Sequence, residues 1–286
     1  MDLTPANTAI VLDSTSDFPA AAERFPNMRI VPLYVNFGSE SFRDHVDIGS
    51  QDFYQRLKES PVLPTTSQPT PQDFVAAFDE LAGYERIYAL QLSARLSGTF
   101  QSAVAAAADL GGERIRVVDT ETASLAVGLL ALAIQRRLAR GTTDEEVEAL
   151  IERFKDENGV VFTVGTLEYL QKGGRIGRAQ ALAGTLLNVK PILSVDDGVI
   201  HPIGKVRGRQ KALEEFARVF SASTENLPGL RLAIAHADAP EWIEVLTDMA
   251  AKIRPLAEIE LVENLGAVVG THAGPGSVGF FWLQDE

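Results

Sequence analysis

The chain contains no cysteine, which excludes disulfides, thiolate nucleophiles and zinc–thiolate sites and suits a reducing compartment. No apolar run reaches the roughly 18 residues needed to cross a bilayer, and residues 1–7 lack the basic and apolar segments of a secretory signal. No two histidines have metal-ligand spacing. We therefore expect a cytoplasmic protein with no transmembrane segment, no metal and no cofactor.

Positive charge is scarce as well. The formal net charge is −13, which argues against a nucleic-acid-binding surface. The exception is the segment 172–211, which holds eight lysine or arginine residues against two aspartates. This local excess indicates an acidic or phosphate-bearing partner, although charge runs are often only solvated faces.

Several catalytic motifs are also missing. The chain has no Gly-x-x-x-x-Gly-Lys-Ser/Thr loop, no Gly-x-Gly-x-x-Gly between a strand and a helix, and no Gly-x-Ser-x-Gly elbow. Ser97, Asp119 and His272 do follow the chain order of an α/β-hydrolase triad, but no local pattern supports one. A serine hydrolase acting on lipid esters therefore stays as an alternative, which labelling with a fluorophosphonate would reveal.

The first half of the 286 residues alternates strands with helices. Strands are expected at 8–12, 29–37, 86–92 and 116–119, and helices at 50–57, 71–81, 98–110 and 123–140. This alternation predicts an N-terminal domain of three layers, α/β/α, around a parallel sheet.

The pattern changes in the second half. Strands at 160–164 and 232–236, helices at 209–220 and 240–253, and a hairpin at 192–203 around an Asp-Gly turn predict a mixed sheet. We place the boundary near 163–166, so that an N-terminal α/β domain covers 1–163 and a smaller C-terminal α/β domain covers 164–286.

Two loops rich in hydroxyl side chains could hold a ligand. In the loop 64–73, Thr70 fits a helix N-cap, which leaves Thr66 and Ser67 in a rigid polar loop with no structural role. In the loop 93–103, Ser97 follows a strand of the parallel sheet, at the edge where ligands usually bind. As an N-cap, Ser97 would also stand beside backbone N–H groups that favour an anion.

A third candidate is His272, which we expect in a glycine-rich loop over 270–279. Glycines let a backbone approach a ligand closely, and a histidine can change its charge near neutral pH. The simpler alternatives are a surface histidine in a tight turn and, for Ser97, a cap that serves only its helix. His45, His201 and His236 are interpreted as structural.

Eight segments taken together resemble the DegV family, over nearly the whole chain. Departures are small: Thr120 stands where many members have serine, and Gln210 where a basic residue is common. The segments are Asp13-Ser14-Thr15-Ser16-Asp17, Thr66-Ser67-Gln68-Pro69, Leu96-Ser97-Gly98-Thr99, Val118-Asp119-Thr120, Leu170-Gln171-Lys172-Gly173-Gly174-Arg175-Ile176, Lys190-Pro191-Ile192-Leu193, Arg207-Gly208-Arg209 and Thr271-His272-Ala273-Gly274-Pro275-Gly276.

The resemblance implies the two-domain DegV-like fold with a long-chain fatty acid buried between or within the domains. It implies that Thr66 or Ser67, together with Ser97 and His272, holds the carboxylate, since a buried carboxylate needs hydrogen bonds. The pocket neighbours that it implies are Gly98, Thr99, Thr120, Gly270 and Thr271. Family members called FakB are non-catalytic and present the acyl carboxylate to an ATP-dependent fatty acid kinase subunit, which makes acyl phosphate.

The proposed carboxylate site does not use the basic residues of two family motifs. We assign Lys172, Arg175, Arg207 and Arg209 to docking the kinase subunit, because complementary charge sets encounter rate and register. The segments 104–108 and 182–187 are candidates for the wall around the fatty-acid tail. A carrier of another apolar acid remains an alternative, and transient contact with a membrane surface is compatible with the pattern.

Overall fold

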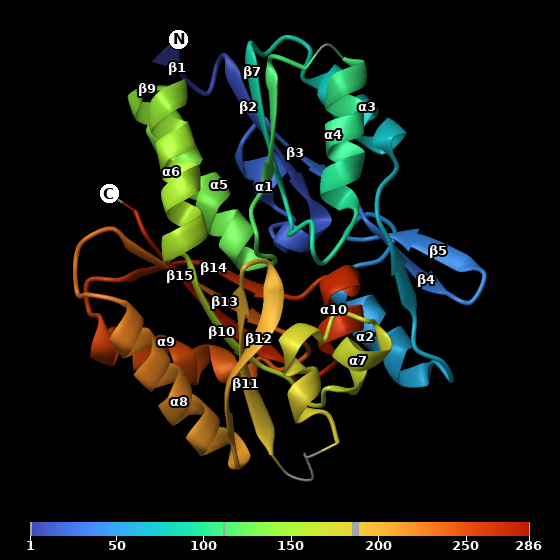
Figure 1. The fold of residues 1–286 in the computed structure, drawn as a ribbon, viewed down its shortest axis with the longest axis vertical. Helices are drawn as coiled ribbons and strands as arrows, with labels where there is room; N and C mark the ends of the chain where they lie inside the picture. The colour runs from blue at the N-terminus through green and yellow to red at the C-terminus, as the bar shows by residue number, and fades with distance from the viewer. Residues whose placement is uncertain (1, 111, 185–188, 286) are drawn as a thin grey trace.

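A computed structural model describes residues 2–110, 112–184 and 189–285. Figure 1 shows an upper unit built by the first half of the chain and a lower unit built mainly by the second half. The predicted two-unit α/β fold is confirmed. Within the described residues, no helix is both long and apolar enough to cross a membrane.

The upper unit contains a four-stranded parallel sheet in the order β3-β2-β7-β8. Side chains of β2 alternate between two cores, so that Ala9 and Val11 face α3 and α4 while Ile10 and Leu12 face α5. The bounds are β2 Thr8–Asp13, β3 Met28–Val31, β7 Arg86–Gln91, β8 Ile115–Asp119, α3 Pro71–Glu80, α4 Thr99–Asp109 and α5 Leu125–Arg140. The predicted three layers are therefore present.

The lower unit is a six-stranded mixed sheet in the order β12-β11-β10-β15-β13-β14. Only β13 and β14 run parallel, and β11 and β12 form the predicted hairpin around Asp197-Gly198. The bounds are β10 Gly159–Thr163, β11 Lys190–Asp196, β12 Val199–Val206, β13 Leu230–His236, β14 Glu258–Asn264, β15 Val278–Gln284, α8 Gly208–Ser223 and α9 Glu241–Ile253.

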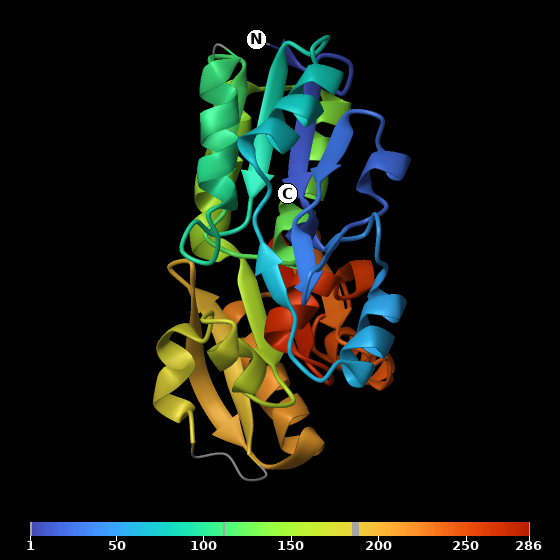
Figure 2. The ribbon, with the colours of Figure 1, turned by 90° about the vertical axis from the view of Figure 1, so that its right-hand side faces the viewer.

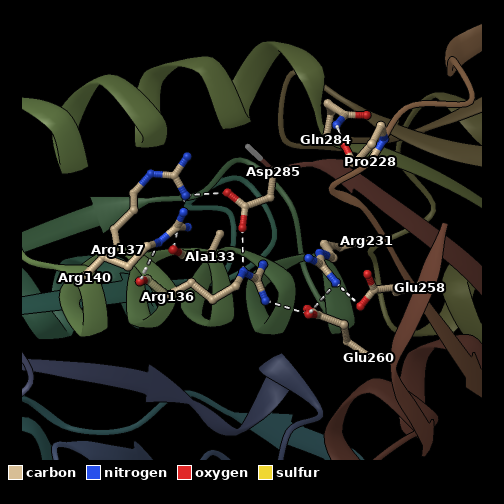
Figure 3. Close-up of polar contacts among 10 residues, drawn as sticks. All are labelled: Ala133, Arg136, Arg137, Arg140, Pro228, Arg231, Glu258, Glu260, Gln284 and Asp285. Carbon is tan, nitrogen blue, oxygen red and sulfur yellow. Dashed lines mark hydrogen bonds and ion pairs between the residues drawn. The ribbon is translucent and has the colours of Figure 1, made fainter. Parts of the chain in front are cut away.

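Helix α5 lies between the two sheets and joins them. Its apolar side chains belong to one buried cluster with Leu12 of β2, Ala235 of β13 and Phe281 of β15. At its carboxyl end, Arg136 forms ion pairs of 2.6 Å with both Glu260 and Asp285 (Figure 3). The helix is therefore buried on both sides, which explains its nearly continuous apolar sequence.

The predicted boundary at 163/164 is one strand too late. Strand β10, which we placed at the end of the first domain, pairs with β11 and β15 of the lower sheet. The chain changes sheets between α6 (Asp144–Glu157) and β10. A buried strand has the same local pattern in either sheet, so its partner was not readable from the sequence.

A small antiparallel sheet, β5-β4-β6, was not predicted. The segment expected as one strand over 29–37 divides at Pro32, which cannot donate a ladder hydrogen bond, and its second half becomes β4. Figure 2 shows this sheet beside α10, with which β4 and β6 are in contact. The bounds are β4 Tyr34–Phe37, β5 Glu40–Arg43, β6 Thr65–Ser67 and α10 Ala267–Ala273.

The remaining elements are short or connect these layers. They are β1 Asp2–Leu3, η1 Ser14–Ser16, α1 Ala21–Arg24, α2 Ser50–Glu59, β9 Thr142–Thr143, α7 Glu168–Lys172 and η2 Gly177–Leu182.

Candidate ligand-binding cavity

A cavity lies between the two units and is lined by residues of both. Its wall is formed by strands of the lower sheet, by β6, α7 and α10, and by loops of the upper unit, including the loop before α5. Most of the wall is apolar: Leu33, Leu92, Leu96, Ala123, Val160, Phe162, Leu170, Val195, Ile200, Ala235, Leu265, Val268, Val269, Ala273, Val278, Gly279 and Phe281. Such a lining suits a long hydrocarbon group.

Two polar side chains of the cavity wall, one from each unit, are hydrogen-bonded to each other. Thr66 Oγ1 lies 2.8 Å from His272 Nε2. Arg175 acts electrostatically on His272, and its Nε donates to the carbonyl of Leu96, the neighbour of Ser97, at 2.9 Å. We call Thr66, Ser97, Arg175 and His272, all of which line the cavity, the polar cluster.

The other hydroxyls in the wall are engaged elsewhere. Ser124 donates to Asp17 at 2.6 Å, Ser277 donates to the carbonyl of Ala273 at 2.7 Å, and Thr15 donates to Asp13. Their protons point into the protein, so these residues add little polarity to the cavity. Polar groups that can bind a ligand are thus concentrated in the polar cluster.

His272 lies in the last turn of α10, so our expectation of a glycine-rich loop around it was wrong. The stretch Ala267–Gly270 packs in the interior, which favours a short helix over a loop. Burial lowers the pKa of His272 to about 4, with a further contribution from the positive charge of Arg175. The imidazole is therefore neutral at pH 7.

Gly173 makes room for this imidazole. A Cβ at that position would lie 2.2 Å from His272 Nδ1, closer than atoms can approach. Within the described part of the chain, Nδ1 is buried and has no hydrogen-bond partner. The first glycine of the motif Gly173-Gly174-Arg175 is therefore required because any larger side chain there would clash with His272.

The structure separates Thr66 from Ser67. Successive side chains of β6 point to opposite sides, and Thr66 lines the cavity while Ser67 is exposed. Ser67 Oγ accepts a hydrogen bond from Asn36 Nδ2 at 3.0 Å on the outer side. Of the two predicted alternatives, Thr66 is the one that lines the cavity, and its contact with a ligand stays a prediction.

Ser97 reaches the cavity from a position slightly different from the one predicted. Helix α4 begins at Thr99 with Gly98 as its N-cap, so Ser97 stands one residue earlier. Its Oγ accepts from the Thr99 amide at 3.3 Å and lies 2.9 Å from Thr99 Oγ1. Gln68 fixes this loop by donating to the Gly98 carbonyl at 3.1 Å, a contact that the sequence did not indicate.

The five predicted pocket neighbours are not among the residues that line the cavity. The hydroxyls of Thr120 and Thr271 donate to the carbonyls of Gln91 and Ala267, and Thr99 is fully buried. Gly98 contacts Gln68, and Gly270 faces Tyr54 and Phe53 of α2.

The predicted tail wall needs correction. Ala106 and Ala107 pack under α3, while Val104, Ala105 and Ala108 are exposed, so none of 104–108 reaches the cavity. Residues 185–187 of the second candidate lie outside the described residues. Leu182 and Ala183 pack on the small cluster that includes the cavity residues Leu170 and Ile200.

The hydrolase triad is not assembled in the described residues. His272 Nε2 is bonded to Thr66, and Ser97 Oγ to Thr99, with no hydrogen bond between serine and histidine. Asp119 accepts from the amides of Ala94 and Glu121 instead of from an imidazole. The serine therefore has no base in hydrogen-bonding position. Nor do the described residues contain a cluster of side chains that could hold a metal ion.

The four basic residues predicted for docking do not share one surface role. Arg175 lines the cavity and belongs to the polar cluster, a position that its sequence motif did not predict. Lys172 is exposed and pairs with Glu168 at 2.6 Å. Arg207 and Arg209 are exposed at the start of α8, with the Arg209 guanidinium 4.8 Å from the Trp242 ring centre.

Comparison with known proteins matches this chain, over residues 7–285, to the profile of a family described as "Uncharacterised protein, DegV family". The chain belongs to the DegV family. The match spans both units and hence every wall of the cavity. The predicted family membership is confirmed.

Individual DegV proteins show the same extent of similarity. A DegV domain-containing protein of Streptomyces coelicolor is 37% identical over 277 residues, which cover 96% of this chain and 97% of that protein. The solved structure titled "Fatty Acid Binding of a DegV family Protein from Thermus thermophilus" is 39% identical, with a TM-score of 0.91, covering 97% of this chain and 99% of the other. The structure titled "Crystal Structure of DegV, a fatty acid binding protein from Bacillus subtilis" is 36% identical, with a TM-score of 0.86 and the same coverage.

Proposed function

We propose that this protein binds a long-chain fatty acid in the cavity, with the carboxylate at the polar cluster and the tail along the apolar wall. The observation that carries this is the confinement of available polar groups to one cluster within an otherwise apolar cavity. The two solved relatives whose titles describe fatty acid binding support the proposal. Each methylene buried along the wall contributes about 0.8 kcal/mol.

The carboxylate would receive its hydrogen bonds from neutral groups. Since His272 is neutral, its Nε2–H can donate to Thr66, whose hydroxyl proton is then free to donate to the ligand. This tautomer leaves Nδ1 without a proton, which costs less than burying an unpartnered N–H there. Ser97 supplies a second hydroxyl, and Arg175 supplies positive charge nearby.

The most direct test is mass spectrometry of lipid extracted from the protein purified from a bacterial host. We expect a fatty acid in near-stoichiometric amount, because a buried tail leaves slowly. Only trace lipid, together with no binding of added oleate or palmitate, would refute the proposal. Recovery of a different apolar acid would identify the protein as a carrier of that acid instead.

We further propose that the protein presents the bound carboxylate to an ATP-dependent fatty acid kinase subunit and does no chemistry itself. The family resemblance suggests this partner, and the unactivated Ser97 is consistent with a binding role. Exposed Lys172, Arg207 and Arg209 provide positive charge for docking on a protein of net charge −13.

Charge reversal at the start of α8 tests the docking surface. The double variant Arg207→Glu/Arg209→Glu should keep its lipid but slow acyl-phosphate formation with the kinase subunit. The wild-type rate should depend more strongly on salt than the variant rate, because salt screens exposed charges. Equal rates at low ionic strength would show that these arginines do not dock the partner.

A further inference from the structure

The segment Asp13-Ser14-Thr15-Ser16-Asp17 is outside the polar cluster, yet all five residues are buried. Asp17 joins two elements of the cavity wall. Its Oδ1 accepts from the Gly266 amide at 2.8 Å, directly before α10, and its Oδ2 accepts from Ser124 Oγ at 2.6 Å, directly before α5. A buried carboxylate from the first unit is thus bonded to the start of the helix that carries His272.

Asp44 makes the same kind of contact one residue further along α10. Its Oδ1 accepts from the Ala267 amide at 2.7 Å and its Oδ2 from Ser14 Oγ at 3.0 Å. His45 Nε2 lies 3.9 Å from Asp17 Oδ1 and 4.0 Å from Asp44 Oδ1. Burial alone would lower the pKa of His45, but the two carboxylates outweigh it and raise that pKa, so a positive charge here is favoured.

Helix α10 depends on such contacts because it has only seven residues. Helices shorter than roughly 12 residues are not stable by themselves. Its cavity face carries Val268, Val269 and His272. A Cβ at Gly266 would lie 2.4 Å from His45 Nε2, so the helix start is fitted closely against this acidic pair.

We propose that Asp17 and Asp44 are positioning residues that hold the start of α10 and thereby set the place of His272 in the cavity. The expected effect on fatty-acid binding rests on the proposed function. Its geometric part, the placement of His272, does not depend on any ligand.

The first experiment compares alanine and asparagine substitutions. Asp17→Ala and Asp44→Ala remove the acceptors of the Gly266 and Ala267 amides, and we expect at least tenfold weaker binding of oleate. Asp17→Asn and Asp44→Asn keep one acceptor oxygen in place, and we expect binding within about threefold of wild type, since a neutral acceptor makes a weaker bond than a carboxylate. Wild-type affinity in folded alanine variants would overturn the proposal.

The matched control is Asp285→Ala. Asp285 is as buried as Asp17 and Asp44, and it is ion-paired with Arg136 and Arg137 at the carboxyl end of α5 (Figure 3), whereas Asp17 bonds to Ser124 at the start of that helix. The Asp285→Ala variant should be less stable than the wild type but should keep its affinity for oleate. An equal loss of affinity in this control would show that general destabilisation, and not positioning, explains the effect.

The second readout is the ¹⁵N NMR signal of the His272 ring, which is practical to assign because the chain has four histidines. In the ligand-free protein, these signals should shift in Asp17→Ala and Asp44→Ala and stay unchanged in Asp285→Ala. Unchanged His272 signals in the two alanine variants would overturn the proposal, whether or not the protein binds a fatty acid. Shifted His272 signals in a protein that binds no fatty acid would refute only the proposed function.

If neither alanine variant folds, the double variant Asp17→Asn/Asp44→Asn replaces them. It keeps acceptors for both amides but removes both charges, so we expect roughly tenfold weaker binding and a shift of the His272 signals. Wild-type affinity and wild-type signals in this double variant would overturn the proposal.

Discussion

Replacing Thr66 by valine changes the polar cluster with little change of shape. Valine keeps the branched side chain that suits a strand, but it removes the hydroxyl that lies 2.8 Å from His272 Nε2 and lines the cavity. A fatty acid would lose one charge-assisted hydrogen bond, which contributes about 1.5–3 kcal/mol. The dissociation constant should therefore rise roughly 10- to 100-fold.

The assay is displacement of a fluorescent fatty acid from delipidated protein, together with urea unfolding to confirm that the variant is folded. Loss of the Thr66–His272 hydrogen bond itself should lower the free energy of unfolding by only about 0.5–1.5 kcal/mol. The matched control is Ser67→Ala, the exposed neighbour on the other side of β6, which should bind like wild type. Equal affinities of the Thr66 variant, the Ser67 variant and the wild type would refute the placement of the carboxylate at this cluster.

Three further predictions concern the same cavity. Ser97→Ala and His272→Ala should each weaken fatty-acid binding by about 1–3 kcal/mol, because each removes a polar group from around a buried anion. If calorimetry finds neither effect, the carboxylate binds at another place in the protein. Gly173→Ala should also weaken binding, because its Cβ would lie 2.2 Å from His272 Nδ1, and a crystal structure with an unmoved imidazole would contradict this. Burial lowers the pKa of His272 from its ordinary value of 6.5 to about 4. The folded state therefore has its full stability above pH 6.5, where the imidazole is neutral in both states, and this contribution to stability is lost as the pH falls through about 4. Between pH 6.5 and 4 the wild type should therefore lose up to about 3 kcal/mol more stability than His272→Gln, and parallel urea curves would contradict it. Asp13 and Asp44, whose pKa values burial raises to about 6, act in the opposite direction but cancel in this comparison.

The elements of the parallel sheet were predictable because their signals are local. A continuous apolar run such as Thr8–Asp13 is typical of a strand that is buried on both faces, and the loop that follows it marks the edge where ligands bind. The capping box of Thr70 and Asp73 likewise fixed the start of α3 before any tertiary contact was known.

The candidate site was predictable in its residue types but less so in its geometry. Thr66, Ser97 and His272 line one cavity, and their contact with a carboxylate stays a prediction. The sequence could not decide between Thr66 and Ser67, because the segment 65–67 becomes a strand only by pairing with β4. Nor could it assign Arg175 to the cavity, because that depends on a contact with Leu96, 79 residues away.

The sequence by itself determined the order of the main strands and helices, the family and three of the four residues of the polar cluster, since periodicity, capping and motif spacing act over a few residues. The tertiary structure decided which sheet receives β10, which side of β6 faces the cavity and why the buried Asp17 and Asp44 contact α10. These outcomes depend on pairings between distant segments, such as the 206 residues that separate Thr66 from His272. The energy of such a pairing depends on both segments at once, so it cannot be predicted from the local sequence of either segment alone.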